Sequence, residues 1–349
     1  MRERMLAVLR GEGPDRVPFV QYNHAAGPND AIWAEIGKAN MGILRWVRLH
    51  RVEHPNCRIH TEPLAHRGLR GLRTVIETPA GAMAEERFFE PALNTASIQK
   101  HFVRAADDYA VLQAYLEDSV VIEDTVEFDL ACEELGEEGL PLVRLERTPF
   151  QQLWIQWASI ADLALHMVDC PDRVALCVDA LVREMRAVFE IVARTPVPFV
   201  DFPDNITAPV IGEANFREYC VPFYNELADV LAEQTSLVLV HMDGDLKPLW
   251  DAVGEARIDG IDSLSPPPDN DTSVAEAVSR WPDRCVLVNF PSSVHLMSPR
   301  AIYDQASELL QQGGRTGRLQ IQISENMPPD AWRKSFPEIV RAIQDFGPL

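Results

Sequence analysis

Positive charge is scarce in this sequence. Its 349 residues contain 32 Lys and Arg against 53 Asp and Glu, which gives a net charge of −21 at pH 7. A protein that binds a polyanion needs clustered basic side chains, and an anionic membrane surface makes the same demand. No basic run in the chain meets that demand. The composition therefore excludes nucleic acid and membrane lipid as partners and favours a small-molecule substrate.

Long hydrophobic runs and secretion signals are also missing. No stretch reaches the roughly 18 apolar residues of a membrane-spanning helix. The opening MRERMLAVLRGEG carries charges on both sides of a short apolar patch, unlike a signal peptide. The six cysteines form no C-x-x-C pair, and a chain with 46% hydrophobic residues needs no disulfides to complete its core. We therefore predict reduced thiols and a cytoplasmic protein, for which a monomer and an oligomer are both compatible with the sequence.

Glycine-rich phosphate-binding motifs are a third absence. No G-x-G-x-x-G follows an apolar run and no G-x-x-x-x-G-K-[ST] occurs, so dinucleotide and P-loop folds have no support. Instead, short apolar runs alternate with helix-period segments, which is typical of a parallel sheet covered on both faces. Eight runs of strand length predict an α/β fold, the closed (β/α)8 TIM barrel. These runs are 17–22, 119–123, 141–146, 197–202, 236–241, 259–265, 285–290 and 318–324.

The segment from about 24 to 118 departs from this regular alternation. We predict that it is an N-terminal insertion that elaborates one barrel domain spanning residues 1–349. Within it, 73–78 and 84–89 have strand-like patterns on either side of Pro79 and Gly81, which predicts a hairpin. A helix is expected near 106–117.

Polar residues gather where the predicted strands end, and the active site of a barrel of this kind lies at the carboxyl ends of its strands. Asp, Asn and Ser are also common turn residues, so about half of these positions are expected to serve only the turn. The polar residues at the strand ends are Asn23, His24, Glu146, Arg147, Asp204, Asn205, His241, Asp243, Asp262, Ser265, Asn289, Ser292, Ser324, Glu325 and Asn326.

HMDGD at 241–245 is the most informative strand end. Two His-x-acid pairs occur in the chain, about as many as its composition gives by chance. The pair alone is therefore no evidence for a metal site, and the evidence is the place of His241 in the predicted strand. His241 closes the most apolar strand, and side chains at i and i+2 point the same way. With Glu325 after the last strand, His241 and Asp243 could form a three-ligand metal site with an open position. The alternative is a solvated turn. His295, by contrast, is expected at the surface.

Four motifs in order resemble the uroporphyrinogen decarboxylase superfamily. The second of them contains an Asp-Asn strand end followed by an F-x-x-Y-x-x-P helix. The four are RERMLAVLRGEGPDRVPF (2–19), FPDNITAPVIGEANFREYCVPFYNEL (202–227), HMDGDLKPLWD (241–251) and ISENMPPDAW (323–332). The resemblance runs from end to end and implies a (β/α)8 barrel.

The superfamily includes metal-free decarboxylases and corrinoid-linked methyltransferases. The decarboxylases bind an acidic tetrapyrrole through an R-Q-A-G-R stretch after the first strand, where this chain has QYNHAAGP (21–28) without arginine. That departure disfavours haem-pathway decarboxylation. The chain is more similar to the methyltransferases, whose sulfur-activating members bind zinc through H-x-C and a later cysteine.

The resemblance implies a metal centre of a different donor type in this chain. His241 and Asp243 stand at the H-x-C position, and Glu325 stands near the later cysteine. Carboxylates give a harder, more Lewis-acidic centre than thiolates, which suits polarisation of an oxygen. We therefore expect a divalent metal, with zinc as the leading candidate, and transfer of a methyl group from a small O- or N-methylated substrate. Because no D-x-H-x-x-G cobalamin loop is present, the corrinoid would belong to a separate protein.

The resemblance also suggests roles for other strand-end residues. Asp204 is predicted as a catalytic residue that orients the substrate together with Asn205, and His24 or Tyr224 would handle a proton. Arg147 and Asn289 are predicted to bind substrate. Two alternatives stay open. One is a metal-free lyase acting on a carboxylate, in which Asp204 and His241 stabilise a protonated intermediate. The other is a barrel that binds a ligand without turnover.

Overall fold

The computed structural model of the protein describes residues 1–91 and 95–349. The chain divides into two compact units. Unit 1 comprises Met1–Arg48, Thr125–Leu145 and Pro196–Leu349, and unit 2 comprises Leu49–Asp124 and Glu146–Thr195. Among the residues described, no helix has both the length and the apolar character needed to cross a membrane.

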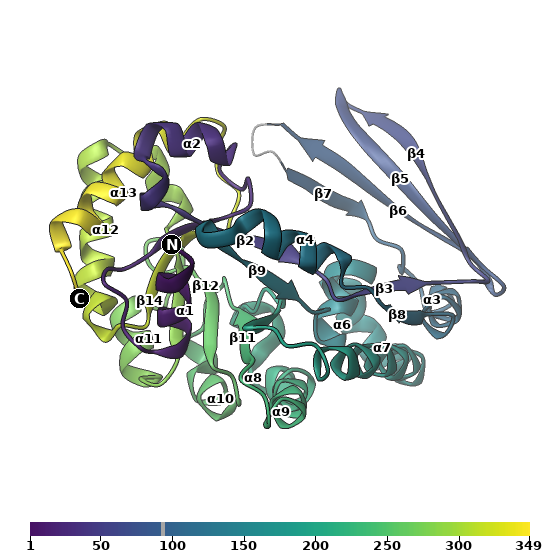
Figure 1. The fold of residues 1–349 in the computed structure, drawn as a ribbon. Helices are drawn as coiled ribbons and strands as arrows, with labels where there is room; N and C mark the ends of the chain where they lie inside the picture. Colours follow the sequence, from purple (N-terminus) through teal and green to yellow (C-terminus); the bar gives the residue numbers. More distant parts are fainter. Residues whose placement is uncertain (92–94) are drawn as a thin grey trace. The chain divides into compact units, whose positions relative to one another are not determined.

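Unit 1 is a closed barrel of eight strands, every neighbouring pair of which is parallel (Figure 1). The order around the barrel is β1-β14-β13-β12-β11-β10-β9-β2. The strands are β1 (Phe19–Tyr22), β2 (Gly42–Val47), β9 (Gly139–Arg144), β10 (Phe199–Phe202), β11 (Leu237–His241), β12 (Gly260–Leu264), β13 (Cys285–Asn289) and β14 (Leu319–Ile323). The predicted TIM-barrel fold is confirmed.

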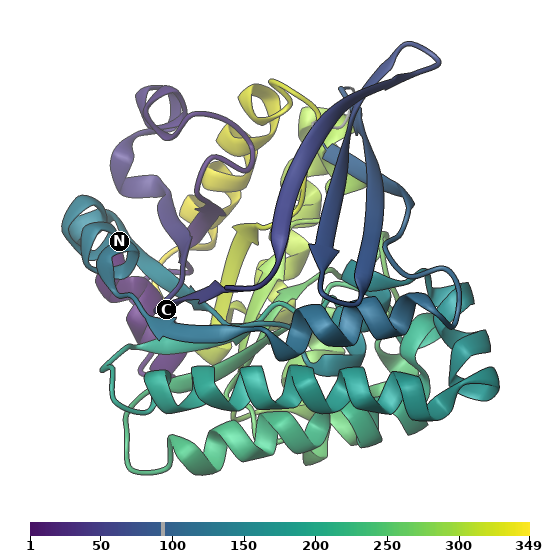
Figure 2. The same ribbon diagram turned by 90° about the vertical axis from the view of Figure 1, so that its right-hand side faces the viewer.

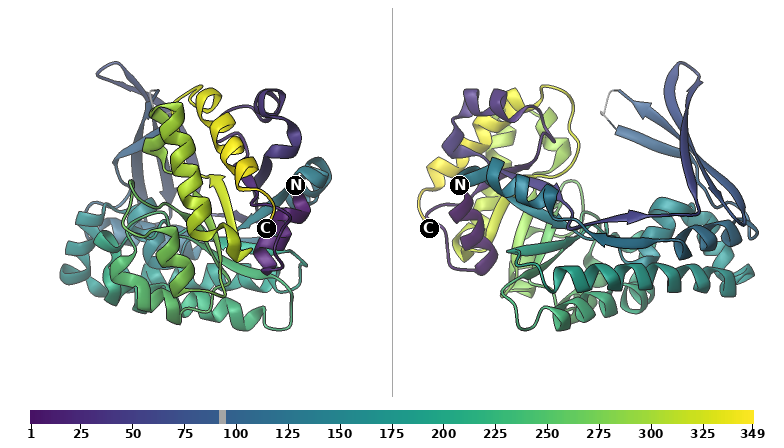
Figure 3. Two further views of the ribbon diagram at one scale, coloured as in Figure 1. Left: turned by 90° about the vertical axis from the view of Figure 1, so that its left-hand side faces the viewer. Right: turned by 45° about the vertical axis from the view of Figure 1, so that its right-hand side comes forward.

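Helices connect these strands on the outside of the barrel. Several begin with the capping chemistry that their sequences provide. Ser273 and Glu276 form a capping box at the start of α11, and Ser298 accepts from the backbone of Ala301 at the start of α12. Helices α12 and α13 pack against each other, as Figure 3 shows. The helices of unit 1 are α1 (Arg2–Arg10), α2 (Asn29–Ile36), α4 (Val126–Leu135), α8 (Ala208–Tyr219), α9 (Val221–Val230), α10 (Trp250–Glu255), α11 (Val274–Arg280), α12 (Pro299–Gly313) and α13 (Trp332–Phe346).

The barrel interior is apolar at its amino end. Helix α1 closes that end by inserting Met5, Leu6, Val8 and Leu9 among the strand side chains. Gly42 at the start of β2 lets the residue before α1 approach this strand closely, because a Cβ at Gly42 would lie 2.5 Å from the side chain of Met1. The strand residues of this core cluster include Val20, Leu44, Leu142, Phe199, Leu239 and Leu287.

The interior becomes polar at the carboxyl end. Side chains alternate across a strand, so the residue two positions after each core residue faces the same interior. Those residues are Tyr22, Trp46, Arg144, Asp201, His241 and Asn289, and we call them the upper layer. The barrel therefore carries its polar and aromatic interior side chains at the end where active sites of this fold lie.

The described residues of unit 2 form two antiparallel sheets, four α-helices and one π-helix turn, Leu153–Trp157. Strands β3 (His50–Glu53) and β8 (Val120–Glu123) form one sheet. The other has the order β4-β5-β6-β7, with β4 (Arg58–His66), β5 (Leu69–Thr78), β6 (Gly81–Glu90) and β7 (Thr95–Lys100) (Figure 2). The predicted hairpin is confirmed as β5 and β6. The helices are α3 (Asp108–Glu117), α5 (Pro149–Gln152), α6 (Ile160–Asp169) and α7 (Pro171–Val192).

One predicted barrel strand was wrong. The run at 119–123 forms β8, which pairs with β3 outside the barrel. The second barrel strand is instead β2, which lies inside the segment predicted as an insertion. Its sequence GILRWV does not read as a buried strand because Arg45 and Trp46 interrupt the apolar run. Arg45 faces outward and pairs with Glu134 of α4, which explains the charge.

Candidate metal centre

His241 ends β11 and is buried. Its Nδ1 lies 2.9 Å from Oδ2 of Asp262, on the neighbouring strand β12. Asp262 also accepts hydrogen bonds from the Tyr22 hydroxyl and, at Oδ1, from Nε2 of Gln322 at 2.8 Å. A carboxylate in this setting accepts the Nδ1–H of the imidazole and thereby fixes its tautomer and its orientation. Nε2 is then the nitrogen whose lone pair can bind a metal.

Two further carboxylates face Nε2 of His241. Oε1 of Glu325 lies 3.3 Å from this nitrogen, and Oδ2 of Asp243 lies 3.7 Å from it. Within the described part of the chain, the buried Nε2 and Oε1 atoms have no hydrogen-bond partner. The ligand atoms of these three residues lie within 4.8 Å of one another, close enough to hold a metal ion. We call His241, Asp243 and Glu325 the carboxylate–imidazole cluster.

The charges of this cluster favour a cation between its members. Burial lowers the pKa of His241, but its contacts with Asp243, Asp262 and Glu325 raise it by more, so the net pKa lies well above the usual histidine value. Burial raises the pKa of Asp243, but His241 and Asn205 lower it by more, so the net pKa is lowered. A proton on the imidazole or a divalent cation in its place satisfies these groups.

The loop after β10 supports Asp243. The side-chain amide of Asn205 donates to Oδ2 of Asp243 at 2.9 Å. Asn205 adopts a positive φ of 51°, a conformation that asparagine tolerates better than most residues. The backbone amide of Gly244 donates to the carbonyl of Ile206 at 3.1 Å, and a Cβ on this glycine would lie 2.2 Å from Cβ of Thr207. Gly244, which lies between Asp243 and Asp245, therefore lets the loop after β11 approach the loop after β10.

Asp204 and Tyr224 form a second buried pair. The Tyr224 hydroxyl donates to Oδ2 of Asp204, and both side chains are fully buried. Burial of Tyr224, together with the nearby carboxylate, raises its pKa well above the usual value. The phenol therefore keeps its proton at neutral pH and holds Asp204 in one orientation.

Three other residues singled out from the sequence have different surroundings. His24 is exposed and lines a hollow of about 310 Å³ in unit 1, whose lining includes none of the carboxylate–imidazole cluster. Asn289 is buried, and its Oδ1 accepts from the backbone amide of Ser324 at 3.1 Å, which positions the loop that carries Glu325. Arg147 belongs to unit 2.

The surface position predicted for His295 was wrong. It is 1% exposed, and its Nδ1 lies 2.5 Å from Oγ of Ser335 on α13. Burial lowers the pKa of His295 to about 4. The five residues of SSVHL form a short 3₁₀ helix that turns this side chain inward.

Several residues of the barrel mouth were missed by the sequence reasoning. Asp201 and Gln322 are completely buried in β10 and β14, close to the carboxyl ends of these strands, whereas Asp262 was named as a strand-end residue but was not given its role beside His241. Burial and the charge of Asp262 raise the pKa of Asp201 well above its usual value. A usable signal existed for Asp201, which is the one polar residue of the strand sequence FVDF, a position that in a parallel barrel is buried on either face.

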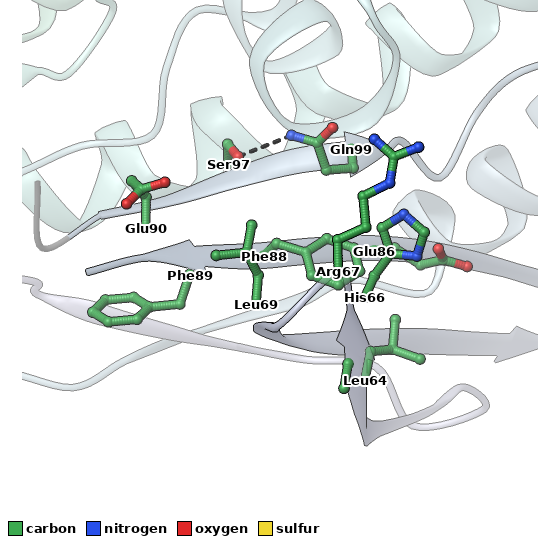
Figure 4. A pocket seen from close by; sticks show the side chains of 11 residues that line it. Leu64, His66, Arg67, Leu69, Glu86, Phe88, Phe89, Glu90, Ser97 and Gln99 are labelled. Carbon is green, nitrogen blue, oxygen red and sulfur yellow. Dashed lines mark hydrogen bonds between the residues drawn. The ribbon is translucent and has the colours of Figure 1, made fainter. Parts of the chain in front are cut away.

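A separate hollow of about 530 Å³ lies on the four-stranded sheet of unit 2 (Figure 4). Phe88 and His66 both line it, and their ring centres lie 6.0 Å apart. Glu86 at its edge is paired with Lys100. In the described ranges, two groups of side chains could hold a metal, the carboxylate–imidazole cluster and a second group formed by Asp201, His241 and Asp262, and both belong to unit 1. This hollow is therefore not part of the candidate centre.

Comparison with known proteins adds a family to this geometry. Residues 157–345, more than half of the chain, match the family model described as "Uroporphyrinogen decarboxylase (URO-D)". The chain belongs to this family. The match includes strands β11 and β12, which carry His241 and Asp262, and the loop that carries Glu325, so the candidate centre lies within the family domain. No curated protein matches the chain by sequence.

Solved structures that resemble the chain include a methyltransferase from Methanosarcina mazei. That structure has a TM-score of 0.59 at 13% identity, and the alignment covers 99% of this chain and 98% of the other. A B12-independent methionine synthase from Shewanella sp. W3-18-1 aligns with a TM-score of 0.42 at 10% identity, over 90% of this chain and 86% of the other. At these identities the likeness to the first structure concerns the fold.

Proposed function

We propose that this protein is a metal-dependent methyltransferase that moves a methyl group from a small O- or N-methylated substrate to a corrinoid carried by a separate protein. The observation that carries the proposal is the buried Nε2 of His241, which faces Asp243 and Glu325 while Nδ1 is fixed by Asp262. One imidazole nitrogen and two carboxylate oxygens are donor atoms that bind zinc, and three protein ligands is the number found in catalytic zinc sites.

Membership of the uroporphyrinogen decarboxylase family supports an enzymatic function. The position of the centre supports it as well, since enzymes of this fold carry their active sites at the carboxyl end of the barrel. The fold shared with the methyltransferase from Methanosarcina mazei is compatible with the proposal. The donor set favours a particular substrate chemistry. Oxygen donors make a divalent centre hard, which suits the oxygen of a methyl ether better than a thiol.

The cluster residues would bind the metal, and Asp262 would hold the imidazole ring of His241 in place. When bound, a divalent metal supplies Lewis acidity that withdraws charge from the heteroatom losing its methyl group. In a balanced transfer, the electron pair of the broken methyl–heteroatom bond would stay on the heteroatom, and a reduced corrinoid on the partner protein would provide the acceptor for the methyl group. This chain contributes binding and orientation to that step.

Asp204, Asn205 and Tyr224 would orient the substrate beside the cluster. Asn205 already contacts Asp243, and the Tyr224 hydroxyl fixes the carboxylate of Asp204. Asn289 would act through the loop that carries Glu325. The proton-transfer role of His24 and the substrate-binding role of Arg147 stay predictions.

Elemental analysis of the purified protein tests the metal centre. We expect about one equivalent of a divalent metal in the wild type and little in His241→Ala and Glu325→Ala, because each removes one of three protein ligands. His60→Ala is the matched control, since His60 and Glu62 form the other His-x-acid pair, which is exposed in unit 2.

The outcomes separate the candidate functions. Metal in the wild type and in His60→Ala alone would support the methyltransferase, and methoxylated compounds would then be screened with corrinoid proteins for a change in cobalt absorbance. A wild type that binds no metal after reconstitution with zinc would overturn the proposal. Release of CO2 from candidate carboxylates would then be measured to test the metal-free lyase.

A further inference from the structure

Helix α6 of unit 2, labelled in Figure 1, exposes apolar side chains. Its inner side is packed, since Leu163 is buried and Nδ1 of His166 lies 3.3 Å from the Tyr109 hydroxyl. A helix at a protein surface normally turns polar residues outward, and a helix that is apolar on both sides is normally buried on both. Every exposed residue of α6 before Asp169 is apolar. These residues, which we call the α6 face, are Ile160, Ala161, Ala164, Leu165 and Val168.

The α6 face is large enough to form the centre of a protein interface. Val168 is 79% exposed, Leu165 is 62% exposed and Ile160 is 37% exposed. With the two alanines, these residues leave roughly 400 Å² uncovered, about half of the surface that one partner buries in a stable protein–protein interface. Apolar patches of this size on a protein surface often serve as contact sites.

Charge is nearly missing from this part of the chain. In a sequence that is 24% charged, the segment 148–168 contains a single Asp, Asp162, and no Glu, Lys or Arg. The carboxylate of Asp162 accepts a hydrogen bond from Oγ of Ser159 at 2.8 Å, at the start of the helix. Because each copy of the chain has a net charge of −21, like charges repel two copies over most of their surfaces. At the α6 face, two copies can approach without that repulsion.

The composition of the α6 face distinguishes among partners. A helix that lies on a membrane carries Lys and Arg beside its apolar side, and the segment 148–168 has neither. A corrinoid protein that docks and leaves would need a surface of ordinary polarity, whereas the interfaces of permanent homodimers are more apolar. The α6 face therefore fits a second copy of this chain better than a membrane or a transient carrier.

The α6 face is also complementary to itself. Ile160, Ala164 and Val168 are spaced four residues apart and form one ridge along the helix, with the small residue in the middle. An antiparallel crossing of two α6 helices at Ala164 would place Ile160 of each copy against Val168 of the other, and the two alanines would permit a close approach. We propose that the α6 face is the contact surface of a homodimer with a two-fold axis near Ala164.

Analytical ultracentrifugation of the full-length protein tests this proposal. We expect a species with twice the chain mass of 39.2 kDa, and a dissociation constant of about 1 μM or lower. Raising the NaCl concentration should strengthen the dimer, because salt screens the repulsion between two acidic copies. A dimer held by ion pairs would instead weaken in salt, which would contradict an uncharged contact surface.

Substitutions locate the contact. Val168→Glu should weaken the dimer at least about 100-fold, because it buries an unpaired carboxylate against the second copy. Val126→Glu is the matched control, since Val126 is also a helical valine and is 64% exposed on α4. It should dimerise as the wild type does. Ala164→Cys should form a disulfide between copies under mild oxidation, because the crossing brings these residues together. Ala110→Cys, exposed on α3, should not exceed the wild-type background.

Three results would overturn the inference. The first is a wild type that stays monomeric at roughly 100 μM. The second is a dimer that Val168→Glu and Val126→Glu affect equally. The third is an intact dimer in Val168→Glu with a loss of methyl transfer to a corrinoid protein, which would assign the α6 face to that carrier. The inference is independent of the metal centre, so His241→Ala should dimerise as the wild type does.

Discussion

Asp262 lies 2.9 Å from Nδ1 of His241 and determines which nitrogen of that histidine faces the other carboxylates. The contact is buried on both sides and is shared with the Tyr22 hydroxyl. Because the two residues are register partners on adjacent strands, the distance is fixed by the barrel itself. The carboxylate–imidazole cluster therefore depends on a residue that would not touch the metal.

The first prediction concerns this supporting carboxylate. In Asp262→Asn the side-chain amide can donate to Nδ1, which moves the imidazole proton to Nε2 and blocks metal binding there. We expect zinc affinity to fall about 10- to 100-fold, the usual effect of losing such a partner. Competition with a chelating dye measures it. Asp251→Asn, on the exposed face of α10, should bind zinc as the wild type does.

The second prediction concerns the pH dependence of the metal-free protein. The pKa of His241 is raised in the folded state, mainly because contacts with three carboxylates outweigh burial. This group therefore contributes stability that is fully present below its unfolded pKa near 6.5 and is lost as pH rises through the raised folded value. Urea denaturation of metal-free wild type should show this loss between neutral and alkaline pH.

Zinc should reverse that trend. A metal displaces the proton from Nε2, so its affinity rises with pH over the same window and its binding releases a proton. Calorimetry in buffers of different ionisation enthalpy would count that proton. A metal-free His241→Ala protein should show a flatter pH profile than the wild type. An identical profile would show that His241 does not cause the dependence.

The third prediction concerns His295, which lies outside the carboxylate–imidazole cluster. Burial lowers its pKa from 6.5 to about 4 in the folded protein. Its contribution is therefore present above pH 6.5 and is lost as pH falls toward 4, and roughly 2 kcal/mol should disappear between pH 7 and pH 5. Urea titrations at the two pH values measure the loss. His295→Gln should lose less stability than the wild type over this interval.

The fourth prediction tests the close contact between loops at Gly244. A Cβ at this position would lie 2.2 Å from Cβ of Thr207, so Gly244→Ala must displace the loop that carries Asn205. We expect a loss of about 1–3 kcal/mol in the free energy of unfolding, and weaker zinc binding through Asp243. Gly254→Ala is the control, since the nearest atom to its Cβ would lie 3.6 Å away and the residue is helical. It should stabilise the protein slightly.

Much of the barrel could be predicted because parallel strands buried on both faces give continuous apolar runs. Strand β2 was not predicted because it lacks such a run: Arg45, which pairs with a helix, and Trp46, which lies in the barrel mouth, interrupt it. The proximity of His241, Asp243 and Glu325 could be expected from strand ends that meet at one edge. Asp262 could not be assigned its supporting role, because that role depends on which strands are neighbours and in what register.

The amino end of the barrel is filled by α1, so the polar mouth is the end of the interior at which small molecules can reach the cluster. Substrate entry, product release and docking of a corrinoid protein would then all use the same opening of the barrel. A corrinoid protein docked there would retain a substrate that was already bound and would block the entry of a substrate that was still in solution. The expected kinetic signature is compulsory order, in which the small molecule arrives before the carrier and excess carrier inhibits turnover.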